Sequence, residues 1–153
     1  MNAQQLYREA GVLGANPVEL VIRLYEKMVD DLRQVSEAIE NNDIKRRTDR
    51  IKHAILIVGH LQSSLDFENG GKVAWDLEIF YKTLRFRLLH LQFHPSKPAV
   101  AQLTTDLLTL REAWIQVERA ENPRAAATGT AEGAAPYVPA DDGTEPVRGE
   151  WQG

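Results

Sequence analysis

The chain has 153 residues, of which 43% are hydrophobic, so it can bury one core and we expect one folded domain. It contains no cysteine, which excludes disulfide bonds, thiolate nucleophiles and cysteine-ligated zinc and is typical of a reducing compartment. Residues 1–120 carry 16 basic and 16 acidic side chains and the remainder 2 and 6, so the net charge of −4 lies in the tail and no basic surplus indicates a nucleic-acid partner.

Residues 1–15 precede the first predicted helix and form a short N-terminal segment, whose apolar side chains include Leu6 and Tyr7. The segment lacks a basic stretch followed by an apolar one, so it does not resemble a secretory signal. No apolar run approaches the roughly 20 residues that a membrane-spanning helix needs. We therefore expect a cytoplasmic protein without membrane insertion.

The first predicted helix has a well-marked start. Asn16 is a suitable N-cap, Pro17 suits the first helical position, and Glu19 completes a capping box. The helix should end near Asn41 and Asn42, because asparagine tolerates the backbone conformation that leaves a helix. Its predicted inner face is Val18, Val21, Tyr25, Met28, Leu32, Val35 and Ile39.

The second predicted helix is capped by Asn42 or Asp43, and both choices remain open. It should end within residues 65–72, where Asn69, Gly70 and Gly71 favour a tight turn because glycine loses the most backbone freedom in a helix. Its predicted inner face is Ile44, Ile51, Ile55, Val58 and Leu65.

The third predicted helix spans about residues 72–94, and two prolines within residues 93–100 end it. Ser96 is a plausible cap for the fourth helix. The predicted inner face is Val73, Leu77, Phe80, Leu84, Leu88 and Leu91 on the third helix, and Val100, Leu103, Leu107, Leu110, Trp114 and Val117 on the fourth.

Four periodic segments joined by short connections predict an all-α fold, an antiparallel up-down-up-down four-helix bundle over residues 16–121. From residue 122 the sequence is rich in small residues, proline, glycine and acids, which cannot bury enough apolar area to offset the entropy of ordering. We expect residues 122–153 to form a disordered tail.

No pattern in the sequence indicates catalysis, a cofactor or a metal. His90 and His94 lie four residues apart and could share a metal ion, but no histidine follows a carboxylate at the Glu-x-x-His spacing that di-metal bundles use. Surface histidines beside a loop are the simpler interpretation. The paired acids Asp30 and Asp31 are expected on a solvated helix face. We predict a non-enzymatic protein with no metal site and no cofactor.

Several apolar side chains lie away from the predicted inner faces. Trp75, Ile79, Phe86 and Phe93 form a row nearly opposite the inner face of the third helix, and Leu56 and Ile57 lie more than about 90° from that of the second. An aromatic row of this length requires a partner. The N-terminal segment, a second copy of the chain in a homodimer, or an amphipathic partner segment could each cover it, and these alternatives remain open.

Three segments in order resemble the flagellar secretion chaperone family. Residues 7–26 are similar to the family's N-terminal tyrosine, its capped helix entry and its Leu-Tyr pair. Residues 63–81 (SSLDFENGGKVAWDLEIFY) are similar to its Ser-Ser-Leu-Asp-Phe-Glu-x-Gly-Gly segment, the most specific of the three. Residues 107–117 are similar to its closing leucine-rich segment with a tryptophan.

The resemblance implies a cytoplasmic chaperone that binds the disordered C-terminal region of flagellin, prevents its polymerisation and hands it to the flagellar export apparatus. Whether other flagellar regulators are further partners stays open. It also implies that the N-terminal segment, with Tyr7, moves on binding. The family tends to be polar where this chain has Trp75 and Phe86, so the aromatic row is not inherited as a flagellin contact. The predicted partner-binding residues are Leu6, Tyr7, Leu56, Ile57, Trp75, Ile79, Phe86 and Phe93. A homodimeric helical adaptor without an unfolded client is the alternative.

Overall fold

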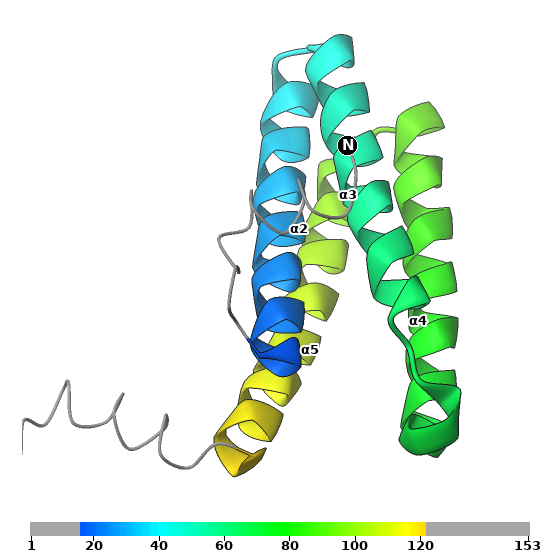
Figure 1. Cartoon of the computed structure of the whole chain (residues 1–153). Helices are drawn as coiled ribbons and strands as arrows, with labels where there is room; N and C mark the ends of the chain where they lie inside the picture. The colour runs from blue at the N-terminus through cyan, green and yellow to red at the C-terminus, as the bar shows by residue number, and fades with distance from the viewer. Residues whose placement is uncertain (1–15, 122–153) are drawn as a thin grey trace, which may run out of the picture. The chain divides into compact units, whose positions relative to one another are not determined.

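Four α-helices make up the part of the chain that the computed structural model describes, residues 16–121 (Figure 1). They are α2 (Pro17–Glu40), α3 (Ile44–Ser63), α4 (Phe67–Phe93) and α5 (Lys97–Glu121), and no strand occurs within these residues. The connections comprise only residues 41–43, 64–66 and 94–96, so each helix runs antiparallel to the one before. The predicted four-helix bundle is confirmed. The predicted N-terminal segment and tail lie outside the described residues.

Most of the predicted helix ends are confirmed. Asn16 caps α2, because its Oδ1 accepts a hydrogen bond from the Glu19 backbone N–H at 2.7 Å. Asn42 leaves α2 in the left-handed region at φ 55°, and Asp43 caps α3 by accepting from a backbone N–H at 3.0 Å. Ser96 accepts from the backbone N–H of Ala99 at 3.2 Å at the start of α5.

The turn predicted at Asn69, Gly70 and Gly71 is wrong in position. The chain turns at residues 64–66, and α4 already begins at Phe67 with Asp66 as its cap. Asp66 Oδ1 accepts backbone N–H groups of the first turn, including that of Asn69 at 3.1 Å. Gly71 then breaks the helical path at φ 53° and ψ −132°, a conformation that residues with a Cβ rarely adopt. The glycine therefore bends α4 after its first turn.

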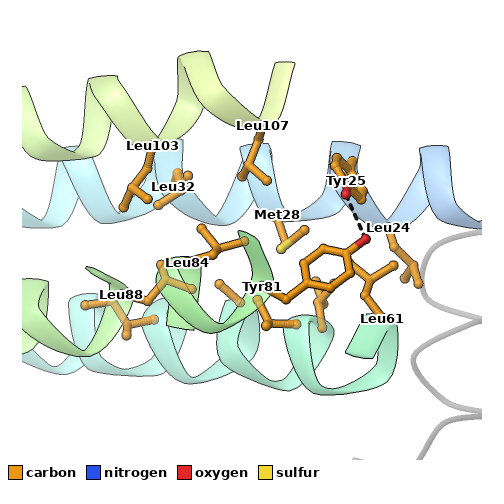
Figure 2. Close-up of a cluster of buried hydrophobic side chains, with 14 of the residues drawn as sticks. Leu24, Tyr25, Met28, Leu32, Leu61, Tyr81, Leu84, Leu88, Leu103 and Leu107 are labelled. Atoms are coloured by element: carbon orange, nitrogen blue, oxygen red, sulfur yellow. Dashed lines mark hydrogen bonds between the residues drawn. The ribbon is translucent and has the colours of Figure 1, made fainter. Parts of the chain in front are cut away.

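The core takes apolar side chains from all four helices (Figure 2). Its packing belongs to the compact unit that extends to Ile115. The largest fully buried side chains are Tyr25, Met28, Leu32 and Val35 of α2, Ile57 of α3, Tyr81, Leu84, Leu88 and Leu91 of α4, and Leu103 and Leu107 of α5. On α4 the buried face is turned from Val73 and Phe80 towards Ala74 and Tyr81. Ile44 and Val73 were expected inside but are exposed, since both lie in the first turns of helical segments at the ends of the bundle.

A buried carboxylate joins α2 to α3, which contradicts the expectation that Asp31 is solvated. Asp31 is fully buried, and its Oδ2 lies 2.6 Å from Nδ1 of His53, which is itself buried. The Arg50 guanidinium lies 3.3 Å from the other carboxylate oxygen. Burial raises the pKa of Asp31, while the hydrogen bond from His53 and the nearby Arg50 charge oppose that rise. The core tolerates this carboxyl group because both oxygens have polar partners.

Candidate functional site

The apolar row predicted on the third helix lies on the surface of α4. We call Trp75, Ile79, Phe86 and Phe93 the outer row; their side chains are 58%, 63%, 67% and 77% exposed. Phe67, from the first turn of α4, packs its ring against Trp75 with 4.4 Å between the centroids. An apolar surface of this length, held on one rigid helix, is typical of a docking surface for another polypeptide.

Two histidines extend the outer row towards the C-terminal end of α4. The His90 ring stacks on that of His94 with 4.4 Å between centroids, and on Phe86 with 6.2 Å. Within residues 16–121 no group of three or more histidine or acidic side chains is placed to hold a metal ion. These contacts make the pair part of an aromatic surface.

The other predicted partner-binding residues have different outcomes. Leu56 is half-buried, whereas Ile57 has no exposed surface at all, so its expected place on the surface is wrong. The reason is that α3 packs against both α2 and α4, which makes its buried arc wider than one stripe. Leu6 and Tyr7 lie outside the described residues.

A groove opens at the end of the bundle where α2 and α4 begin and α3 ends. We call it the end groove; it encloses about 290 Å³. Its lining is Pro17, Val18, Leu20 and Val21 of α2, Leu61 at the end of α3, Ser64, Leu65 and Asp66 of the connection, Gly70, Val73, Ala74, Leu77 and Tyr81 of α4, and Trp114 of α5. Val73 and Leu77 also line a second cavity of about 400 Å³ between α4 and α5, so apolar surface continues around the start of α4.

One lining residue of the end groove, Tyr81, belongs to a buried pair of tyrosines. The hydroxyl oxygens of Tyr25 and Tyr81 are 2.8 Å apart, and a dashed line marks this hydrogen bond in Figure 2. Burial raises the pKa of Tyr25 to about 12, and side-chain hydrogen bonds with Tyr81 and then with Trp114 offset part of this rise. Burial also raises the pKa of Tyr81, so both phenols are neutral at physiological pH.

This groove was not predicted from the sequence. Trp114 was expected in the core, and Tyr81 was assigned no role. A signal was present, because Tyr81 lies four residues after Leu77 and three before Leu84, which puts it on the buried face of α4. A buried tyrosine hydroxyl needs a hydrogen-bonding partner, and that need points to a polar site inside an apolar region.

The geometry thus offers two apolar surfaces, the outer row and the end groove, both suited to binding a polypeptide. None of the helices within residues 16–121 combines the length and the apolar character needed to cross a membrane.

Comparisons with known proteins agree on one family. The model of the family described as flagellar protein FliS matches residues 1–121 of the chain. The chain is 31% identical over 111 residues to the flagellar secretion chaperone FliSB of Pseudomonas aeruginosa, covering 72% of this chain and 88% of that protein. It is 27% identical over 114 residues to the flagellar secretion chaperone FliS of Salmonella typhimurium (74% and 84%) and 31% identical over 114 residues to that of Campylobacter jejuni (74% and 87%).

Proposed function

The chain belongs to the FliS family of flagellar secretion chaperones, and from this premise we propose that it binds the C-terminal region of flagellin, prevents premature polymerisation and delivers flagellin to the export apparatus. A role in flagellar export follows from the family itself. The observation that carries the proposal is the family match over residues 1–121, which includes all four helices and both apolar surfaces.

In this proposal the flagellin segment is bound mainly through apolar contacts. Side chains of the flagellin segment lie along the outer row and in the end groove, where Val73 and Leu77 connect the groove to the cavity between α4 and α5. The N-terminal segment, with Leu6 and Tyr7, occupies the groove until the client displaces it. Pro17 and Val18 line the groove and are separated from that segment only by Asn16, so the segment joins α2 beside the groove.

The energetics suit a carrier that must release its cargo. Ordering a disordered client segment costs about 2 to 5 kcal/mol. A fully buried large apolar side chain contributes about 1.5 to 3 kcal/mol, so a few anchors exceed that cost without making the complex irreversible. No covalent bond is made or broken.

The test is a calorimetric titration of the full chain with a peptide of the C-terminal region of flagellin from the same bacterium. We expect saturable heat and a negative heat-capacity change, because apolar surface is buried on binding. A peptide of the same composition in scrambled order is the control. Absence of heat and of a bound fraction removes the proposal. Light scattering that shows a stable dimer under those conditions would then favour the homodimeric adaptor.

A further inference from the structure

The outer row is part of a longer set of exposed positions that has the period of a coiled coil. From Trp75 to Phe93, six positions of α4 follow one another at alternating spacings of four and three residues. Five of them are apolar and the sixth is a lysine, and all six side chains are exposed. We call this set the heptad seam; it consists of Trp75, Ile79, Lys82, Phe86, Leu89 and Phe93.

The heptad seam lies directly opposite the side of α4 that packs in the core. Leu77, Leu84 and Leu91 are buried at a spacing of seven residues, and each has a seam position two residues before it and two residues after it. At 100° per residue, the seam is therefore about 160° away from these leucines. All six positions follow the break at Gly71, so they lie on one uninterrupted stretch of helix about 27 Å long. A helix of another molecule can lie along this stretch on the side of α4 away from the core.

The charges of α4 are divided between its two halves. Residues 67–78 contain three acids and one lysine, a net charge of −2, whereas residues 79–93 contain three cations and no acid, a net charge of +3. Ion pairs within one copy neutralise part of this charge, but Glu68 in the first half and Arg85 in the second have no ion-pair partner among residues 16–121. Two copies of α4 that lie antiparallel bring opposite charges together, whereas two parallel copies bring like charges together. The charges therefore favour a second copy of the chain in the antiparallel direction.

The positions of the seam residues suit the same arrangement. The six positions are symmetric about residue 84, so a two-fold axis there places each of them opposite another seam position of the second copy. The Lys82 ammonium group then meets an aromatic ring, which attracts a cation, whereas parallel copies would bring two Lys82 side chains together. The layers are Trp75 on Phe93, Ile79 on Leu89 and Lys82 on Phe86, and each occurs twice.

We propose that the free chain forms an antiparallel homodimer along the heptad seam and that the flagellin client displaces the second copy. The displacement, unlike the dimer, rests on the proposed function, which puts the client on the outer row. The seam is shorter than three heptads and contains a lysine, so we expect a weak dimer with a Kd of about 10 to 100 μM. This dimer covers the exposed rings when the chain is concentrated and has no client, and it dissociates on dilution.

Self-association is measured by sedimentation velocity of the full chain at concentrations from about 1 to 500 μM. We expect the weight-average mass to rise from the monomer value of 17.2 kDa towards twice that value. Leu89→Ala and Leu108→Ala are matched variants, because the two leucines are 47% and 43% exposed but only Leu89 belongs to the seam. The dimer Kd should rise about tenfold for Leu89→Ala and stay within about twofold for Leu108→Ala. A monomer at every concentration, or equal effects of the two substitutions, overturns the proposal.

The direction of pairing is tested with single cysteines, since the chain has none of its own. Thr83 and His90 are exposed and lie one heptad apart on the same edge of the seam. In the antiparallel dimer the two copies of Thr83 lie beside the axis, whereas the two copies of His90 are about 21 Å apart along the helices. A short bismaleimide should therefore link Thr83→Cys to its own copy but leave His90→Cys unlinked. Linking of both variants, or of neither in a dimeric sample, overturns the antiparallel seam.

Addition of the flagellin C-terminal peptide to the concentrated chain distinguishes this proposal from the proposed function. We expect the mass of the dimer to be replaced by that of one chain with one peptide. Self-association without any binding of the peptide overturns the proposed function and supports the dimer. Binding of the peptide to a chain that is monomeric at every concentration overturns the dimer alone, and binding that leaves the dimer intact overturns the displacement.

Discussion

Helix α4 carries two apolar faces that behave differently. Its inner face is Ala74, Leu77, Tyr81, Leu84, Leu88 and Leu91, all buried, and its outer row is more than half exposed at every position. Both faces have helical periodicity and large side chains. The inner face is buried because the other helices contribute to the core around it, whereas the outer row has no such cover among residues 16–121. Periodicity therefore identifies the apolar faces of a helix, but the neighbouring helices determine which of these faces is buried within the bundle.

The largest difference between the faces should appear in stability. Leu84 has 1% of its surface exposed, so Leu84→Ala should lower the free energy of unfolding by about 2 to 5 kcal/mol through lost burial and a residual cavity. Phe86→Ala, two residues along the same helix, removes a larger side chain but should change the free energy of unfolding by about 0.5 kcal/mol or less. Urea unfolding followed by far-UV circular dichroism measures both values. Similar losses for the two variants would mean that the outer row is covered in solution.

A second difference should appear at alkaline pH, because the inner face carries a phenol within a hydrogen-bonded pair. Tyr25, the partner of Tyr81, has a folded-state pKa of about 12 against an ordinary value of 10.0. A raised pKa means that the folded state favours the protonated phenol, so this contribution is complete below pH 10 and is lost as the pH rises from 10 through 12. Two pKa units correspond to about 2.7 kcal/mol at most.

Urea midpoints measured between pH 8 and pH 12 test this dependence. The stability of Tyr25→Phe should fall less steeply above pH 10 than that of the unaltered chain, since other titrating groups are the same in both. Phe86→Ala is the control and should keep the unaltered slope, because the outer row contains no titratable group. Parallel slopes for Tyr25→Phe and the unaltered chain would contradict a buried, protonated phenol.

The sequence was sufficient to predict the bundle, most helix caps and the outer row. Those features depend on local signals, such as Asn16 before Pro17, and on one helix at a time. Two errors arose where several helices meet. Ile57 was placed outside because a single stripe was assumed for α3, which is covered on two sides. Asp31 was placed in solvent because its partners Arg50 and His53 come from another helix and are not apparent from the spacing on α2.

The candidate site was predicted only where it lies on one element. The outer row belongs to α4 alone, so the helical period sufficed to find it. The end groove combines residues from α2, α3, α4 and α5, and two of its aromatic lining residues, Tyr81 and Trp114, are 33 positions apart in the sequence. The groove could not be derived without knowing which helix ends meet. The break at Gly71 was likewise predicted as a connection between two helices. Glycine indicates that the backbone leaves the helical conformation, but it does not show whether the helix continues afterwards.

The smallest expected change in stability is for substitutions in the outer row, which should weaken binding without affecting folding. Trp75→Glu combined with Phe86→Glu should leave the unfolding free energy within about 1 kcal/mol, since both side chains are largely exposed. Binding of the flagellin peptide should weaken about tenfold or more, because even one lost anchor is worth about 1.5 to 3 kcal/mol. Lys52→Glu is the control. It lies at an exposed position on α3, changes the net charge of the chain by the same −2 as the double variant, and should bind the peptide normally.

Each result for this double variant assigns the outer row to a different role. Loss of binding with an unchanged melting temperature places the client on the row. Unfolding would mean that these rings are part of a covered core in solution, against their exposure of 58% and 67%. Normal folding and normal binding would leave the row to a second copy of the chain or to the N-terminal segment. Light scattering of the unaltered chain and the double variant then separates these, because only a dimer interface changes the mass when the row becomes charged.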